Sequence, residues 1–475
     1  MSTVALRRRT LAMGSALAAG ALLAACSTTS STSTGAAGTS ATSGGAAAAT
    51  SGGAAATSGG SAASGGATGC AAFSSYGNLK GKKVTIAASI LSPESDHLIA
   101  SWAEFEKCTG VTIQYTGAND FEAQLPVKVA GGNAPDLAYI PQPGLLATMV
   151  KTGKAFEAPA AVLKNVTDNW APVWKGLATV NGKFYGAPSS GNVKSLVWYS
   201  PSQFKAKGWT VPTTWADLMT LSATMKTAGT TPWCGGIGSG TGTGWPATDW
   251  LEELVLRDSG PDVYDKWISH QIKFDSPEIK SAMTLLDNWM RKPGWVVGGS
   301  QGVATTTFQK AGLPLLKGGC AMLQQASFYG AQWPKGTKIG PDGDIFAFYM
   351  PTISTKFGTP VEGGAEFVTA FSNRPEVQAV QTYLSTSAWA SSRVKVATGW
   401  VSANKGVDLS LYTDPIDQLS AKLLTDPKVT FRFDASDLMP SAVGSGAEWK
   451  QFTAFFGENK SIDAVLKAID SAWPQ

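Results

Sequence analysis

Between residues 82 and 140, the spacing of hydrophobic residues alternates between the period of a strand and the period of a helix. Three strands are predicted, at residues 82–88, 111–115 and 135–140. In these runs polar and apolar residues alternate, or apolar residues stand between turn-forming residues. Leu98, Trp102 and Phe105 recur at helical spacing and predict a helix before the second strand. A further helix is predicted over Phe121–Val129, before a glycine pair. This β-α-β-α-β order predicts an α/β fold with a parallel sheet that carries helices on its faces.

The loops after these strands are candidate ligand contacts, because ligands of open parallel sheets bind beyond the carboxyl ends of the strands. The three loops span residues 89–95, 117–120 and 141–144. Asp120 lies in the second loop and Gln142 in the third. We predict that both side chains contact the ligand, although an aspartate is also an ordinary loop residue.

The first 25 residues have the pattern of an export signal. The basic run Arg7–Arg9 precedes an apolar stretch, Leu11–Ala25, that is shorter than the roughly 20 apolar residues of a membrane-spanning helix. The stretch ends in small residues directly before Cys26, which resembles the lipobox of bacterial lipoproteins. The resemblance implies a signal peptide over residues 1–25 and a lipidated Cys26. An ordinary signal peptide with a chance cysteine is the alternative.

Residues 26–69 are predicted to form a disordered tether. After Cys26, only Ser, Thr, Gly and Ala occur up to Gly69. Such a segment cannot bury enough apolar surface to offset its chain entropy. The ordered body then spans residues 70–475, and about 400 residues exceed what one hydrophobic core usually holds, so two lobes are expected.

Four cysteines remain if Cys26 carries a lipid, at positions 70, 108, 234 and 320. An even number of cysteines in an exported chain favours two disulfides. Three pairings are possible, and the expected one joins neighbours in the sequence, Cys70–Cys108 and Cys234–Cys320. Zinc binding is the alternative, but neither a CxxC motif nor a histidine partner supports it.

Several segments in a fixed order carry a resemblance to a known family. The succession of Asn181–Pro188, Ser195–Tyr199 and Val211–Trp215 resembles the first lobe crossing of family 1 extracellular solute-binding proteins, the maltose-binding type. Four further segments are similar to the α-glucoside-binding branch of this family: Thr231–Cys234, Gly244–Trp250, Gln325–Phe328 and Phe431–Pro440. The resemblance covers residues 70–475. At Leu323-Gln324 the branch more often carries His-Arg, which leaves the ligand of this chain open.

The resemblance implies a two-lobed, type II periplasmic-binding-protein-like fold with a ligand cleft between the lobes. Lobe one would comprise residues 70–187 and 362–400, and lobe two residues 188–361 and 401–475. The protein would be the lipid-anchored sugar-binding component of an ABC importer on the outer face of the cytoplasmic membrane. It would capture an α-glucoside such as trehalose, maltose or sucrose and deliver it to the permease subunits and their ATPase. We expect a monomer without a cofactor or a metal site.

A sugar presents hydroxyl groups and apolar C–H faces, so its site needs aromatic surfaces and charged or amide groups. Trp245 and Asp249 are the first candidates, because they stand four residues apart after a glycine-rich loop. Lys194 lies at the predicted crossing, and Arg432 and Asp434 would point to one face of an extended run. The remaining candidates are Trp295, Gln325, Glu366 and Trp400. The structural alternatives are a core tryptophan, a solvated lysine and an Arg432–Asp434 salt bridge.

An exported glycoside hydrolase with two carboxylates about 5–10 Å apart is the main competing interpretation. The whole-chain resemblance to binding proteins argues against it. The chain holds only two histidines, His97 and His270, which leaves histidine-based triads and HExxH zinc sites poorly supplied. A net charge of +4, or +1 without Arg7–Arg9, does not call for nucleic acid. A structural adhesion protein is disfavoured because no segment repeats.

Overall fold

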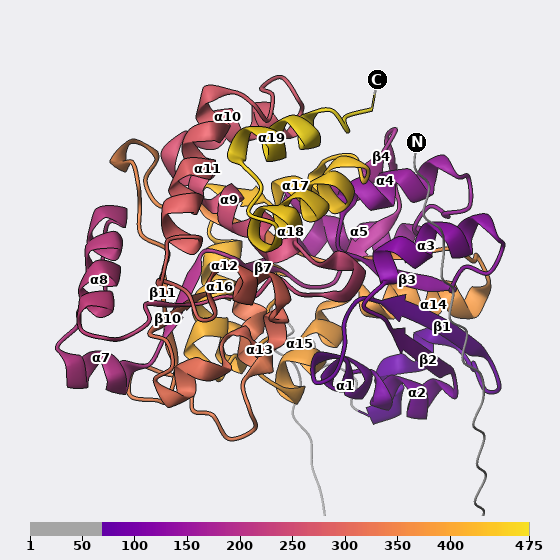
Figure 1. Cartoon of the computed structure of the whole chain (residues 1–475). Helices are drawn as coiled ribbons and strands as arrows, with labels where there is room; N and C mark the ends of the chain where they lie inside the picture. Colours follow the sequence, from indigo (N-terminus) through magenta and orange to yellow (C-terminus); the bar gives the residue numbers. More distant parts are fainter. Residues whose placement is uncertain (1–68, 475) are drawn as a thin grey trace, which may run out of the picture. The chain divides into compact units, whose positions relative to one another are not determined.

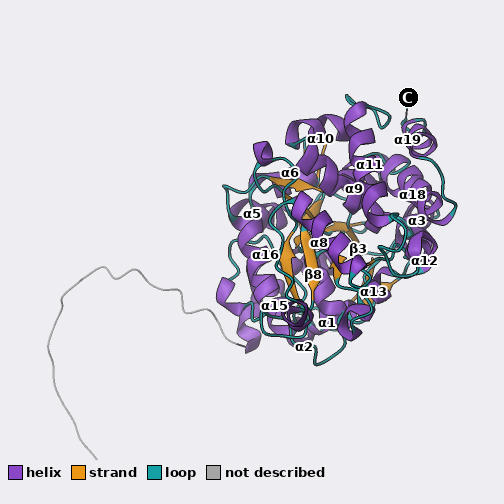
Figure 2. Ribbon diagram, turned by 60° about the vertical axis from the view of Figure 1, so that its left-hand side comes forward, coloured by secondary structure: helices purple, strands orange, loops and turns teal. Residues whose placement is uncertain are grey.

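The computed structural model of the protein describes residues 69–474 (Figure 1). The predicted signal peptide, the predicted lipidation site at Cys26 and the tether up to residue 68 lie outside the described residues. Within residues 69–474, helices enclose several β-sheets (Figure 2), which confirms the predicted α/β class. None of the helices in this range is long and apolar enough to cross a membrane.

The strands predicted near the start of the chain belong to a five-stranded sheet with the order β2-β1-β3-β13-β6. Its strands are β1 (Lys83–Ala88), β2 (Thr112–Gly117), β3 (Leu137–Ile140), β6 (Gly186–Pro188) and β13 (Phe367–Ala370). As predicted, β1 lies parallel to β2 and to β3, whereas β13 runs antiparallel to β3 and β6. The associated helices are α1 (Glu94–Ala100), α2 (Ala103–Thr109), α3 (Phe121–Ala130), α4 (Pro143–Lys151), α14 (Pro375–Leu384) and α15 (Ser387–Val396).

The helix predicted between β1 and β2 is divided into two short helices, α1 and α2. Leu98, Trp102 and Phe105 are all buried, as their helical spacing predicts, but Trp102 lies at the junction. The hydroxyl of Ser101 donates a hydrogen bond to the carbonyl of Leu98 over 2.6 Å. A serine hydroxyl that bonds a carbonyl of the preceding turn competes with regular helical hydrogen bonds, which explains why the hydrophobic period continues while the helix does not.

A second sheet has four strands in the order β11-β8-β10-β9. Its strands are β8 (Leu196–Tyr199), β9 (Trp233–Cys234), β10 (Met322–Gln324) and β11 (Phe346–Tyr349). β8 pairs antiparallel with β10 and β11, so Trp198 lies opposite Leu323 on one side and Ala347 on the other. The chain between β8 and β11 and at the C-terminus adds α7 (Pro201–Lys207), α8 (Trp215–Thr227), α9 (Trp245–Asp258), α10 (Pro261–Ile268), α11 (Pro277–Met290), α12 (Gly299–Thr305), α13 (Phe308–Ala311), α17 (Ala435–Leu438), α18 (Trp449–Gly457) and α19 (Ile462–Asp470).

A small third sheet links the two larger ones. It consists of β7 (Asn192–Val193), β12 (Val361–Gly364) and β14 (Phe431–Phe433), in the order β14-β12-β7. β7 follows β6 of the five-stranded sheet and precedes β8 of the four-stranded sheet, and β12 makes the return passage from β11 to β13. The chain therefore passes between the larger sheets through this crossing sheet. The exact lobe boundaries stay a prediction.

The remaining elements connect these sheets. They are α5 (Ala160–Asn169), α6 (Pro172–Leu177), α16 (Pro415–Thr425) and the two-stranded ribbon of β4 (Thr179–Val180) and β5 (Lys183–Phe184). The ribbon turns at Asn181-Gly182, where both residues have positive φ, 51° and 77°. An Asn-Gly pair suits such a tight hairpin, since both residues tolerate the left-handed region.

The structure contains both disulfides that the cysteine count and spacing predict. Cys70–Cys108 connects the 3-10 helix Gly69–Tyr76 to α2, with 5.0 Å between the Cα atoms. Cys234–Cys320 connects β9 to the residues before β10, with 5.5 Å between the Cα atoms. The Cys70–Cys108 disulfide links the N-terminal end of the described residues to helix α2, beside the five-stranded sheet.

Candidate ligand-binding cavity

A cavity lies at the carboxyl ends of β1, β2 and β3, where the sheet topology predicts a ligand site. All three predicted loops line it, through Ser89–Ser92, Asn119 and Gln142 among others. The facing wall comes from α9, α13, the 3-10 helix Ser327–Gln332 and the segment after β14. Its volume is about 180 Å³. On this measure a single water needs about 10–15 Å³, so the cavity can take a small organic molecule.

Three aromatic side chains form one wall of the cavity. The ring of Trp245 lies 5.0 Å from that of Phe308 and 6.0 Å from that of Phe328, between centroids. Trp245 begins α9 directly after Gly244, which has a φ of 120°. A Cβ at Gly244 would lie 2.2 Å from the carbonyl oxygen of Trp449, so only glycine fits there. This turn places the indole of Trp245 in the cavity, where it can cover the C–H face of a sugar ring.

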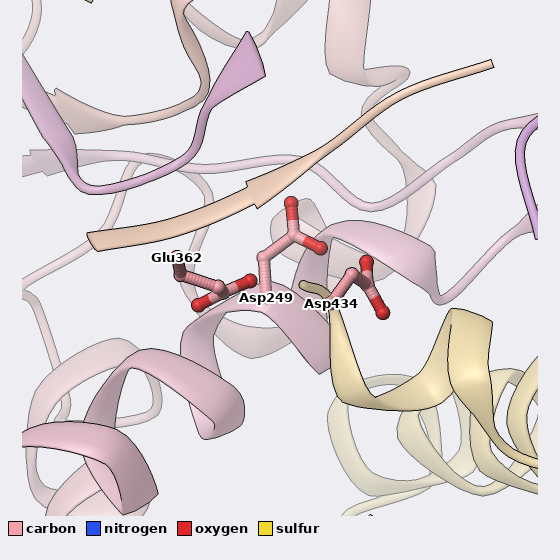
Figure 3. A group of neighbouring side chains, drawn as sticks. All are labelled: Asp249, Glu362 and Asp434. Atoms are coloured by element: carbon pink, nitrogen blue, oxygen red, sulfur yellow. The ribbon is translucent and has the colours of Figure 1, made fainter. Parts of the chain in front are cut away.

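A buried charged cluster lies beside this wall, at the crossing sheet. The ammonium of Lys194 donates to Asp249 Oδ1 over 2.7 Å and to Asp434 Oδ2, and these side chains are 6%, 2% and 3% exposed. Carboxylate oxygens of Glu362, Asp249 and Asp434 lie within 4.8 Å of one another (Figure 3). Lys194 follows β7, Glu362 belongs to β12 and Asp434 follows β14, so each crossing strand contributes one charged group.

Three grouped carboxyls can hold a metal ion in many proteins. Here Lys194 already binds Asp249 and Asp434, and its ammonium supplies the positive charge of the cluster. The other carboxylate oxygen of Asp434 is also engaged: its Oδ1 accepts hydrogen bonds from the Ser436 hydroxyl and the Asp437 backbone amide, each over 2.8 Å. We therefore assign the cationic position to Lys194 rather than to a metal ion.

The electrostatics of the cluster follow from burial and from the lysine. Burial would lower the pKa of Lys194, but the neighbouring carboxylates Asp249 and Asp434 raise it well above its ordinary value, so the ammonium stays charged. Burial also opposes ionisation of Asp434, yet Lys194 holds the pKa of Asp434 below its usual range. Burial raises the pKa of Asp249 to about 7, against the attraction of Lys194. Burial and neighbouring acids raise the pKa of Glu362 well above its ordinary value. Lys194 and Asp434 are thus the permanent ion pair.

A second polar group lies on the wall formed by the loops of the five-stranded sheet. Glu94 at the start of α1 accepts a hydrogen bond from Gln332 Nε2 over 2.9 Å, and Glu366 accepts one from the Ser190 hydroxyl. The guanidinium of Arg393 lies 5.3 Å from the centroid of the Trp400 ring. Its Nε and Nη1 have no hydrogen-bond partner among residues 69–474, although Arg393 is 2% exposed. Charged and neutral donors and acceptors therefore surround the cavity from both walls.

Six of the predicted site residues line the cavity: Gln142, Lys194, Trp245, Glu366, Trp400 and Asp434. Asp249 lies directly behind them, bound to Lys194. The structure thus brings seven of the residues predicted from sequence to one place. Lys194 is held in a buried network, so it is not the solvated lysine of the structural alternative, and Asp434 pairs with Lys194 rather than with Arg432.

The structure does not bring the other four predicted residues to the cavity lining. Arg432 forms a two-pronged salt bridge with Asp265 of α10, over 2.7 and 2.9 Å, and so points away from Asp434. Trp295 packs in the core with Lys292 4.0 Å above its ring. The side-chain oxygen of Gln325 accepts from the Ala326 amide over 2.7 Å. Asp120 stands at the start of α3, and its neighbours Asn119 and Glu122 line the cavity instead.

Sequence reasoning missed several residues that line the cavity. They are Glu94, Asn119, Glu122, Phe308, Phe328, Arg393, Asp437 and Trp449. Glu94 and Asn119 lie inside the loops predicted to follow β1 and β2, so their position in the sequence could have indicated that they line the cavity. Arg393 lies within helix α15, where no local pattern separates it from a surface arginine.

We expect Arg432→Met and Trp295→Phe to leave ligand affinity within about twofold of the parent protein, because both side chains lie outside the cavity lining. Loss of the partly exposed Arg432–Asp265 pair should cost about 1 kcal/mol or less. Titration calorimetry and denaturant melts of the two variants measure both effects. A tenfold loss of affinity in either variant would place that residue at the site after all.

Comparison with known proteins decides the family. Residues 92–391 match the family described as bacterial extracellular solute-binding protein. The chain belongs to this family. A bacterial extracellular solute-binding protein is a binding protein and not an enzyme, which confirms the prediction that the chain catalyses no reaction and excludes the glycoside hydrolase interpretation.

Two relatives are each 33% identical to this solute-binding protein over the aligned residues. The osmoprotective compounds-binding protein GgtB of Synechocystis sp. aligns over 86% of this chain and 96% of its own. The alpha-glucosides-binding periplasmic protein AglE of Rhizobium meliloti aligns over 84% of this chain and 89% of its own. The predicted family resemblance is therefore confirmed.

Solved structures of other solute receptors share the fold. The bacterial solute receptor AcbH superposes with a TM-score of 0.72 at 19% identity, over 82% of this chain and 98% of its own. Maltose-bound MalE3 of T. maritima superposes with a TM-score of 0.63 at 15% identity, over 82% and 98%. These likenesses confirm the predicted maltose-binding-protein-like, type II fold.

Proposed function

We propose that this solute-binding protein captures a sugar, an α-glucoside such as trehalose, maltose or sucrose, for an ABC importer. The observation that carries the proposal is the cavity wall of Trp245, Phe308 and Phe328 beside the Lys194–Asp434 ion pair. Aromatic faces suit the C–H face of a pyranose ring, and charged groups form the stronger hydrogen bonds to its hydroxyls. The relatives support the substrate class, since AglE is named for α-glucosides and GgtB for osmoprotective compounds.

The proposed capture depends on ligand contacts with both walls of the cavity. The walls touch each other directly, through Gln332 and Glu94 and through the Thr241 hydroxyl, which donates to the Asn119 carbonyl over 3.2 Å. A ligand that contacts both walls stabilises the arrangement in which they meet, and only this difference in affinity can shift the balance. The crossing sheet is the proposed hinge, because the chain passes through it between the larger sheets.

Delivery requires partners that recognise the ligand-bound form. We propose that the permease subunits of the importer contact both lobes, 70–187 with 362–400 and 188–361 with 401–475, and that lipidated Cys26 keeps the protein on the outer face of the cytoplasmic membrane. Docking would then report an occupied cavity. The body itself would act as a monomer.

Calorimetric titration with a panel of disaccharides tests the proposed substrate class. Trehalose, maltose and sucrose should bind with a stoichiometry of one, and the β-linked disaccharides cellobiose and lactose should bind at least tenfold more weakly. Chromatography of the mixtures should recover every sugar unchanged. Binding of only peptides, polyols or metal ions would contradict the proposal, although the fold would stand.

A further inference from the structure

Glu94 is a carboxylic acid at the place where the two walls of the cavity meet. It is the first residue of α1, the helix that follows the loop after β1, and it lines the cavity. Its Oε2 accepts the hydrogen bond from Gln332 of the 3-10 helix Ser327–Gln332, on the opposite wall. The same side chain can therefore contact the facing wall and a ligand at once.

The surroundings of Glu94 disfavour a negative charge when the walls meet. The carboxyl of Glu366, from the turn between β12 and β13, also lines the cavity, and a charge on it repels a charge on Glu94; burial raises the pKa of Glu366 as well, so the two carboxyls disfavour each other's ionisation. Arg393 of α15 attracts it but forms no salt bridge with any described residue, and its charge is shared with Glu366 and Asp417. Gln332 supplies a single neutral hydrogen bond. The compensation available to an ionised Glu94 is thus incomplete.

The remaining charged or titratable neighbours do not change this balance. Tyr115 of β2 is neutral and donates its hydroxyl to the Ile90 carbonyl over 2.7 Å. On α1 itself, the carboxylate of Asp96 accepts from the Ser92 hydroxyl, and burial and Arg393 lower the pKa of His97, which favours the neutral form of its imidazole. Loss of water and the charge of Glu366 accordingly raise the pKa of Glu94 to about 8.

We propose that Glu94 is a ligand-contacting residue that takes up a proton from solvent when the walls close around the sugar. The protonated carboxyl keeps Gln332 as donor to one oxygen and offers its own O–H to a ligand hydroxyl. No bond other than this O–H forms, and the proton comes from water or buffer. The inference rests on the proposed sugar-binding function and adds that capture is linked to pH.

The sign of the linkage follows from the two states of Glu94. With the walls apart, the carboxyl faces water and titrates near its ordinary value of 4.5; with the walls together, its pKa is about 8. The bound form therefore holds the extra proton between these values, and affinity falls as the pH rises through this window. Each pH unit inside the window changes the affinity by up to tenfold. Above pH 8 the affinity should level off.

Titration calorimetry of the parent protein with its best-binding α-linked disaccharide tests the inference. At pH 6.5, the binding heats measured in phosphate and in an amine buffer should differ. Divided by the difference between the ionisation enthalpies of the two buffers, this gap should give an uptake of close to one proton per sugar. The affinity should be at least tenfold weaker at pH 9 than at pH 6. Glu94→Gln is neutral at every pH, so it should bind more tightly than the parent does at pH 6, where the parent has not reached the lower end of the window, and it should take up no proton and bind equally at both pH values.

Glu104→Gln, at an exposed acid of α2, is the matched control and should keep the pH profile of the parent. Sugar binding by the parent without proton uptake would overturn the inference and leave the proposed function intact, whether or not Glu94→Gln folds. Unchanged proton uptake in Glu94→Gln would also overturn it. A parent protein that binds no sugar between pH 6 and pH 9 would reject the proposed function and the inference together.

Discussion

Lys194→Met should lower the free energy of unfolding by about 3–5 kcal/mol and abolish measurable sugar binding. The substitution keeps a side chain of similar length but removes the ammonium that Asp249 and Asp434 share. Both carboxyls would then remain buried without a counter-charge, and one partner left alone costs more than the intact pair contributes. Denaturant melts at pH 7 measure the loss.

The pH dependence of the variant separates this cause from simple loss of packing. In Lys194→Met, acid protonates Asp249 and Asp434, so the difference from the parent protein should shrink as the pH falls. The matched control is Lys205→Met on α7, an exposed lysine, which should change stability by less than about 0.5 kcal/mol. A loss below about 1 kcal/mol in Lys194→Met, or one independent of pH, would contradict the assigned role.

Trp245→Ala should weaken sugar binding by about 2 kcal/mol or more, which corresponds to about thirtyfold in the dissociation constant. The substitution removes the indole that forms the cavity wall with Phe308 and Phe328. It also removes the ring that lies 5.8 Å from the Lys194 ammonium. Calorimetric titration gives the dissociation constants directly.

Trp245→Phe provides the graded comparison, because it retains a smaller aromatic face at the same position. Its affinity should fall between those of the parent and Trp245→Ala. The core variant Trp295→Phe controls for general effects of tryptophan loss, since Trp295 lies outside the cavity lining. An affinity of Trp245→Ala within threefold of the parent would mean that the sugar does not stack on this wall.

The sequence predicts the side of the five-stranded sheet on which the cavity lies. The alternation of hydrophobic residues around β1 to β3 is a local signal, and the carboxyl ends of parallel strands follow from it. Gln142 reaches the cavity for this reason. Asp120 shows the limit of the signal, because its loop reaches the cavity while the residue that lines it is the neighbour Asn119.

The charged cluster at the crossing sheet depends on contacts between distant parts of the chain. Lys194 and Asp434 are 240 residues apart in sequence, and β7 and β14 meet only through β12. No local pattern encodes that meeting: the sequence suggests Lys194 by its place at the predicted crossing and Asp434 by its spacing from Arg432, each without the other. Their mutual pairing, rather than separate contacts with a ligand, appears only in the folded chain.

The two-residue spacing of Arg432 and Asp434 predicted a shared face that the structure does not show. β14 ends at Phe433, and Asp434 turns to cap α17, so the alternation of a strand stops between the two residues. Arg432 is left on the outside, where Asp265 provides a partner. A strand of three residues is too short for its side-chain period to be read from sequence alone.

The most direct test of a sugar site in this cavity is an X-ray structure of the protein crystallised with its best-binding α-linked disaccharide. We predict a sugar ring against the indole of Trp245, with hydroxyls bonded to the Lys194–Asp434 pair and to residues of the opposite wall. A disaccharide ordered at any other place, with no sugar in this cavity, would contradict the account.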